Sequence, residues 1–200
     1  MMTQTELDAK MRILLAAKTL FASQGFDGTS VRQICDEAGA NVALVSYHFG
    51  GKENVFAALF DQFFPSERID EFFKQQMSPV EGVKLIIAEV IRFRKSDPEL
   101  AKITDQEVVT RSPRTHHLKR RILPLWTKLR GLLEEGRERG DFRFGSLDQG
   151  LLFVMGSVLF PKNVHMVESI LQEEPLSVDA IIEETQIFVL RGLGMVESDK

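Results

Sequence analysis

The chain has 200 residues, of which 44% are hydrophobic and 27% are charged, a balance typical of a globular protein with enough apolar surface to bury a core. Its single cysteine excludes an internal disulfide bond, and no uncharged stretch reaches the ~20 apolar residues that a membrane span needs. Since the N-terminal residues lack the pattern of a secretory signal, the protein is expected to be cytoplasmic.

The net charge of −4 arises from 25 basic and 29 acidic residues. Residues 1–52 carry five basic and five acidic side chains, so this segment has no surplus of positive charge. Any contact with DNA therefore has to depend on where individual side chains and amides point, because a bulk positive potential is absent.

Helical periodicity dominates the first third of the chain. Apolar residues recur at three- and four-residue spacing, and glycines and prolines end each periodic segment. Ser30 and Asn41 are residues of the N-cap type, and each stands directly before a new segment. The predicted helices are a segment from Ile13 up to Gly25, Val31–Ala38, Val42–His48, and one that begins at Lys52 and ends at Pro65.

The same periodicity continues to the C-terminus, and no run alternates as a strand would. Pro124 lies inside the longest segment and is expected to kink it. The sequence therefore predicts an all-α fold of about nine helices. The further predicted helices are Pro79–Ile91, Pro98–Val109, Thr115–Arg139, Leu147–Phe160 and Val178–Leu193.

The second and third predicted helices have the spacing of a helix-turn-helix, because three residues that include Gly39 join them. Such a pair presents its second helix to the major groove of DNA, although an ordinary corner between two helices has the same spacing. On the short helix over Val42–His48, only Val45 and the following Phe49 are placed to anchor inward. So thin an apolar stripe favours a helix that presents its other side chains to a partner.

The segment from Ile13 to Lys52 resembles the DNA-binding domain of TetR-type transcriptional regulators. The resemblance implies a DNA-binding domain over residues 1–52 and a helical effector-binding and dimerisation domain over 53–200. The residues that carry it are Ile13, Ala17, Leu20, Phe21, Gly25, Phe26, Thr29, Ser30, Val31, Ile34, Ala38, Gly39, Asn41, Val42, Ala43, Tyr47, His48, Phe49, Lys52 and Glu53.

The same resemblance implies which residues contact DNA. Hydroxyls and free amides at the start of the second helix suit a phosphate, and arginine pairs with guanine in the commonest base-specific contact. Many family members have a tyrosine where this chain has Ser46, so one large contact is missing, and the apolar residues at the start of the helix suit thymine methyl groups. The predicted DNA contacts are Thr29, Ser30, Arg32, Asn41, Val42, Ala43, Ser46, Tyr47, His48 and Lys52.

The predicted function is a ligand-responsive repressor that binds a palindromic operator as a homodimer. A chromosome-organising or division-linked DNA-binding protein of the same fold is the alternative, and a helical enzyme or scaffold is a third. No phosphate loop, nucleophile elbow or grouping of Cys, His and Asp at metal-ligand spacing is present, so no enzyme activity, cofactor or metal is predicted. Cys35 lies on an apolar helix face and is interpreted as an inert, packed thiol.

A small-molecule effector is expected to bind among the helices between Pro79 and Phe160. Residues 108–133 are rich in basic side chains and contain no acid, which indicates either a solvated face answered by the acidic 168–184 region or a surface that attracts an anion. The predicted pocket residues are Arg92, His116, Trp126, Met155 and Asn163.

Two segments carry more apolar surface than one 200-residue core can bury all round, and excess of this kind marks an association face. Two such helices from each subunit can close a four-helix bundle with two-fold symmetry. The predicted dimer residues are Leu151, Leu152, Met155, Val158, Leu159, Ile181, Thr185, Phe188 and Val189.

Overall fold

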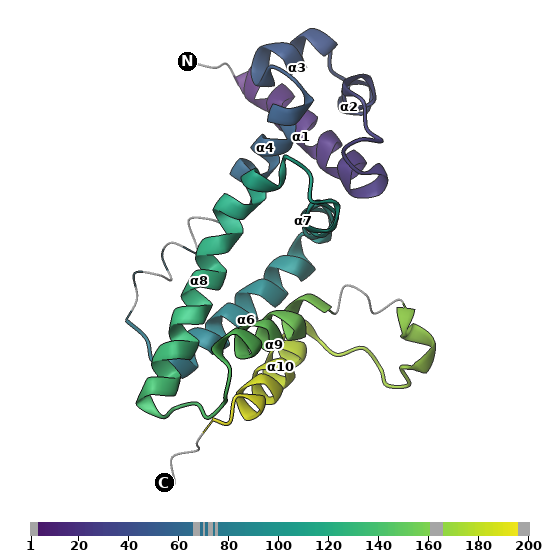
Figure 1. The fold of residues 1–200 in the computed structure, drawn as a ribbon. Helices are drawn as coiled ribbons and strands as arrows, with labels where there is room; N and C mark the ends of the chain where they lie inside the picture. The colour runs from purple at the N-terminus through teal and green to yellow at the C-terminus, as the bar shows by residue number, and fades with distance from the viewer. Residues whose placement is uncertain are drawn as a thin grey trace. The chain divides into compact units, whose positions relative to one another are not determined.

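The computed structural model describes residues 4–65, 69, 71, 74, 76–160 and 166–195. These residues form nine α-helices and one short 3-10 helix, and no strand occurs among them (Figure 1). The predicted all-α fold class is thereby confirmed. None of the described helices is long and apolar enough to cross a bilayer.

The chain divides into two compact units, the first built from residues 1–66 and 97–121 and the second from 67–96 and 122–200. Helix α8, Thr115–Arg139, contributes to both units. The first unit also contains α1 Gln4–Gln24, α2 Val31–Ala38, α3 Val42–Phe49, α4 Lys52–Phe63 and α7 Pro98–Thr110.

The capping residues predicted from the sequence determine where α2 begins and ends and where α3 begins. Ser30 and Gln33 form a capping box at the start of α2, in which the Ser30 hydroxyl accepts from Gln33 N and the Gln33 side chain accepts from Ser30 N. Gly39 ends α2 in the left-handed conformation with φ 58°, where a β-carbon would be strained. Asn41 then accepts a hydrogen bond from Ala43 N and starts α3.

Phenylalanine rings fill the core of the first unit. Phe21, Phe26, Phe56 and Phe60 contact one another at centroid separations of 5.2–5.7 Å, and Phe21 and Phe60 are fully buried. Edge-to-face contacts dominate the set, which is the geometry that the ring quadrupole favours. This cluster joins α1 to α4 and fixes the loop that precedes α2.

The second unit packs α6 Pro79–Ser96, the later part of α8, α9 Leu147–Leu159 and α10 Val178–Gly192. Gly82 lets α6 approach α8 closely, since a β-carbon there would lie 2.6 Å from Leu132 Cδ1. Helix α10 packs against both α6 and α9. The 3-10 helix Glu168–Ile170 lies between α9 and α10 along the chain.

Candidate nucleic-acid interface

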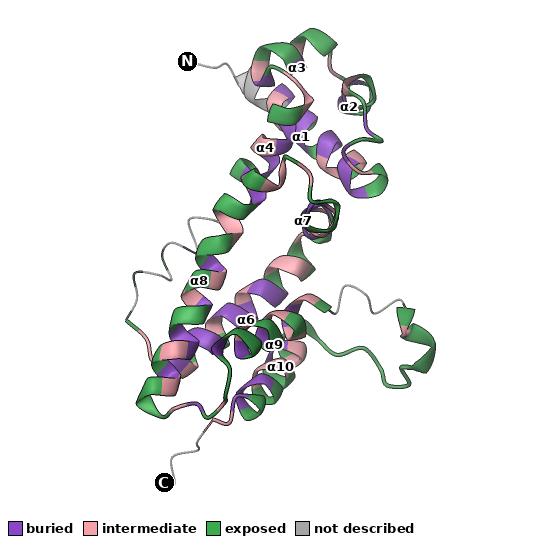
Figure 2. Cartoon of the chain, in the orientation of Figure 1, coloured by how far each residue is buried: buried purple, intermediate pink, exposed green. Residues whose placement is uncertain are grey.

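Half of the residues of helix α3 are exposed, and much of the helix is green in Figure 2. Val45 and Phe49 are buried and attach the helix to the rest of the first unit, as the sequence predicted. Val42 is 48% exposed and Tyr47 is 75% exposed, although both are large apolar or aromatic residues. The remaining exposed residues of this surface, which we call the α3 face, are Asn41, Ala43 and Ser46.

Two of the predicted DNA contacts, Ser30 and Arg32, lie at the start of α2. Ser30 is exposed, and its hydroxyl is already engaged with Gln33 in the capping box. Arg32 is exposed one residue into the helix. The free amides of the first turn and the Arg32 guanidinium are therefore the groups at this helix end that remain open to a phosphate or a base.

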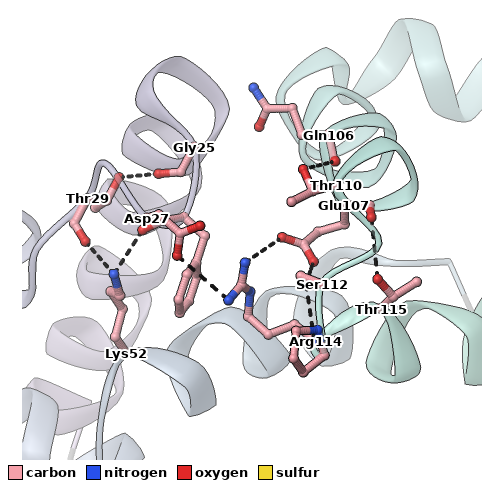
Figure 3. A network of polar contacts seen from close by, with 12 residues as sticks. Gly25, Asp27, Thr29, Lys52, Gln106, Glu107, Thr110, Ser112, Arg114 and Thr115 are labelled. Carbon is pink, nitrogen blue, oxygen red and sulfur yellow. Dashed lines mark hydrogen bonds and ion pairs between the residues drawn. The ribbon is translucent and has the colours of Figure 1, made fainter.

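Thr29 and Lys52, which are both predicted DNA contacts, make structural contacts within the first unit. Thr29 is 1% exposed, and its hydroxyl donates to Gly25 O at 2.8 Å. The Lys52 ammonium donates to Phe26 O at 2.9 Å and to Thr29 O at 2.7 Å, and it lies 4.1 Å from the centroid of the Phe26 ring (Figure 3). Both side chains thus hold the turn that positions α2.

Replacing Lys52 with Ala is expected to destabilise the protein by about 1–2 kcal/mol, because two carbonyl acceptors lose their donor and the Phe26 ring loses its cation. Urea unfolding measures this loss, with the exposed Lys102→Ala as the matched control. The salt dependence of operator binding is expected to keep its slope. If the variant instead kept its stability and the slope of log affinity against log salt fell by about one, Lys52 would contact a DNA phosphate.

His48 is half-buried at the end of α3, between Tyr47 and Phe49. Its Nε2 atom is buried and makes no hydrogen bond to any residue that the structure describes. The ring contacts Tyr47 at a centroid separation of 5.0 Å. His48 thereby packs against Tyr47, whose own side chain is largely exposed.

A polar network that the sequence did not reveal joins the loop before α2 to the turn between α7 and α8. Arg114 lies 3.8 Å from the centroid of Phe26 and pairs with Glu107 at 3.2 Å and with Asp27 at 3.8 Å. The Glu107 side chain is 6% exposed, and the Ser112 hydroxyl also donates to it (Figure 3). Arg114 belongs to the run interpreted as a solvated face, and no local pattern distinguishes it from its neighbours.

Replacing Arg114 with Ala is expected to cost about 2–3 kcal/mol of unfolding free energy, because the buried Glu107 carboxylate would lose its countercharge. Urea unfolding of Arg114→Ala, Glu107→Ala and the double variant forms a thermodynamic cycle. The double variant is expected to lose less than the sum of the two single losses. If the losses of unfolding free energy were strictly additive and the loss in Arg114→Ala were small, Arg114 would be a solvated side chain without a role in stability.

A cavity of about 200 Å³ lies beside this network, within the first unit. None of the predicted pocket residues lines it. His116 is exposed in the first unit, while Trp126 and Met155 are half-buried in the second, where Arg92 pairs with Glu89 and Asp179. Asn163 lies outside the described residues. The cavity lining is Phe21, Gln24, Gly25, Phe26, Asp27, Gly28, Phe56, Ile103, Gln106, Glu107, Thr110 and Arg114.

The predicted dimer residues separate into two groups on α9 and α10. Val158 and Val189 are 2% and 0% exposed within one protomer, so they belong to its own core and are not available to a partner. Leu152 and Phe188 are 56% and 70% exposed. The intermediate positions are Leu151, Met155, Leu159, Ile181 and Thr185. Both helices are apolar on two sides, and the periodicity did not distinguish the side that packs inward.

Other candidate chemical groups have ordinary environments. Cys35 is buried, and burial, followed by the charge of Asp36, raises the pKa of its thiol, which disfavours the reactive thiolate. The rings of His116 and His117 lie 3.8 Å apart between centroids. Among the described residues, no group of three His, Cys, Asp or Glu side chains is placed to hold a metal ion.

Residues 13–59 match the sequence pattern of the bacterial regulatory proteins of the tetR family. By this match, residues 13–59 form a DNA-binding domain of the TetR type. It is 24% identical to the probable HTH-type transcriptional regulator YttP of Bacillus subtilis, over 92% of this chain and 93% of that protein. It is also similar to the crystal structure of HlyIIR, a hemolysin II transcriptional regulator, with 29% identity, coverage of 90% and 97%, and a TM-score of 0.73.

A third relative shares the fold at lower identity. The transcriptional regulator FadR of Bacillus subtilis, whose structure is a complex with stearoyl-CoA, is 21% identical over 91% of this chain and 98% of that one, with a TM-score of 0.69. These relatives are named as regulators of transcription. The chain is a DNA-binding transcriptional regulator, and its helix-turn-helix, which lies within the matched residues, consists of α2 and α3.

Proposed function

We propose that this protein is a ligand-responsive repressor that binds a palindromic operator as a homodimer. The observation that carries the proposal is the α3 face, in which a helix held by only two buried residues exposes all of its leading side chains. Exposed apolar and aromatic side chains gathered on one short helix, here Val42 and Tyr47, favour a partner that covers them. A helix of this kind fits the major groove, which admits an α-helix.

Each exposed group has a chemically suitable counterpart on DNA. Arg32 suits the acceptors of guanine, while Asn41 and Ser46 donate and accept hydrogen bonds at base edges or phosphates. Val42 and Ala43 have no hydrogen-bonding side-chain atoms and suit thymine methyl groups. Tyr47 and the amides behind Ser30 suit phosphates, which set the register of the helix on the duplex.

The homodimer is supported by the exposed apolar residues of α9 and α10, of which Leu152 and Phe188 are the most exposed. A two-fold axis through such a face uses one patch twice, and the same axis presents two copies of α3 to two half-sites. A dimer of this kind covers about one turn of DNA and blocks the access of other proteins to it. This favours a repressor.

The effector is proposed to be a small molecule that binds within the second unit. The likeness to FadR supports a fold able to enclose a ligand, and Arg92, Trp126 and Met155 remain the proposed contacts in this chain. The predicted contact His116 belongs to the first unit, and Asn163 lies outside the described residues. No cofactor is required for DNA binding of this kind. The predicted boundary at residue 52 also stands as a proposal.

Genome-wide footprinting with the purified protein tests the proposed function directly. Bound sites are expected to be few, palindromic and located at promoters, and a ligand that binds the protein is expected to change the affinity for these sites. Many sites spread along the chromosome without relation to promoters would favour the chromosome-organising alternative. If the protein bound no DNA specifically, the third alternative, a helical enzyme or scaffold, would be favoured.

A further inference from the structure

The chain between α9 and α10 exposes an apolar, acidic segment that no described residue of the protomer covers. Residues 166–176, which we call the arm, contain four large side chains, Met166, Ile170, Leu171 and Leu176, that are between 53% and 75% exposed. Figure 1 shows the arm extending away from α9 and α10, which lie side by side. Its described backbone hydrogen bonds are local, from Ile170 N to Val167 O and from Leu171 N to Glu168 O.

The arm is also strongly acidic. Glu168, Glu173 and Glu174 are exposed, the arm contains no basic residue, and none of these carboxylates forms an ion pair with a residue that the structure describes. An exposed segment that combines apolar side chains with one sign of charge needs a partner of the opposite charge that also offers apolar surface.

Helix α8 carries a surface with the complementary composition. His116, Lys119, Arg120 and Leu123 follow one another at helical spacing and are all exposed, on the side opposite the buried Leu118, Leu125 and Leu129. Leu123 is 53% exposed. No described residue forms an ion pair with Lys119 or Arg120. We call these four exposed residues the α8 stripe.

We propose that the arm of one subunit docks on the α8 stripe of a second copy of this chain. Each surface is exposed, so each is open to a partner. A homodimer with two-fold symmetry covers both at once, because each subunit gives one arm and receives the other. The arm lies along the chain between the two helices that carry the exposed dimer residues, and it ends one residue before Ser177, the N-cap of α10.

This inference rests on the homodimer of the proposed function and adds to it a second, electrostatic contact that is independent of α9 and α10. The apolar side chains of the arm then lie against Leu123, and Glu173 and Glu174 lie near Lys119 and Arg120. The contact makes dimer affinity fall as salt is added, because exposed charge pairs are screened over about 10 Å at 0.1 M ionic strength.

Paired charge reversals test the contact. The arm-reversed variant is Glu173→Lys with Glu174→Lys, and the stripe-reversed variant is Lys119→Glu with Arg120→Glu. Each is expected to raise the dimer dissociation constant about ten-fold at low salt, measured by analytical ultracentrifugation. Asp36→Lys with Glu37→Lys is the control, since it makes the same change in charge on exposed residues of α2 and is expected to leave the dimer unchanged.

Mixing the two variants decides between contact with the partner and contact within one chain. In an equimolar mixture, the heterodimer matches each arm with an oppositely charged stripe, so wild-type dimer affinity is expected to return. A contact within one chain would give no recovery on mixing, and recovery only when all four changes are made together, which would overturn the proposal.

Two other results would also overturn it. Unchanged dimerisation in both variants, with a wild-type dimer that Phe188→Asp dissociates, would remove the arm contact and leave the homodimer standing. Weaker operator binding by the stripe-reversed variant with an intact dimer would make the stripe a nucleic-acid surface instead. A wild-type monomer at micromolar concentration would contradict both the arm contact and the homodimer of the proposed function.

Discussion

Replacing Phe188 with Asp is expected to convert the protein to monomers that keep their helical content. Phe188 is 70% exposed in the protomer, so the substitution removes nothing from the protomer core. In a two-fold dimer the side chain is used twice, and burying a phenylalanine contributes about 1.5–3 kcal/mol each time. The dimer dissociation constant is therefore expected to rise roughly a hundred-fold or more, as measured by sedimentation equilibrium.

Operator affinity is expected to fall with the dimer. A dimer holds two copies of α3 on one DNA, so the second half-site is bound at a high effective concentration, and a monomer loses this advantage. A palindrome bound equally well by Phe188→Asp monomers would contradict the dimeric mode of binding.

The adjacent Val189 provides the matched control. It is fully buried within the protomer, so Val189→Asp would place an uncompensated charge in the core and is expected to unfold the second unit, with loss of circular dichroism. Aspartate at position 188 is thus expected to dissociate the dimer without unfolding, whereas aspartate at position 189 is expected to unfold the second unit. A Val189→Asp variant that remained folded and monomeric would show that Val189 belongs to the dimer face, as its sequence pattern predicted.

The sequence predicted the helix-turn-helix closely because its determinants are local. The caps at Ser30 and Asn41, the left-handed Gly39 and the two anchors of α3 all act within a few residues, so their spacing contains the information needed. The bounds of α2 and the start of α3 agree with the prediction, and α3 ends at Phe49, one residue later. Helix α8 continues unbroken through Pro124.

Roles that depend on distant contacts did not follow from the sequence. Lys52 is a predicted DNA contact, and only the fold shows that its ammonium also binds carbonyls 23 and 26 residues away. Arg114 lies in a run of basic residues, and only the fold brings it against Phe26. On α9 and α10 the helical period identifies apolar faces, but packing against α6 decides which of them is internal.

The α3 face leads to a prediction in which stability and DNA binding change in opposite directions. Ala43 is exposed in the first turn of α3. Glutamate at this position of a helix is stabilised by the positive N-terminal end of the dipole, by about 0.3–1 kcal/mol. Ala43→Glu is therefore expected to unfold at slightly higher urea concentration than the wild-type protein.

The same carboxylate would face the phosphates and base edges of the major groove if α3 is the recognition helix. It would be desolvated there beside like charges, so operator affinity is expected to fall by roughly two orders of magnitude in fluorescence anisotropy with labelled DNA. Ala43→Gln has nearly the same shape without the charge, and it is expected to lose much less affinity. Since the Ala43→Glu protein is at least as stable as the wild type, its lost binding has no explanation in unfolding. Full operator affinity in Ala43→Glu would place the DNA on a surface other than the α3 face.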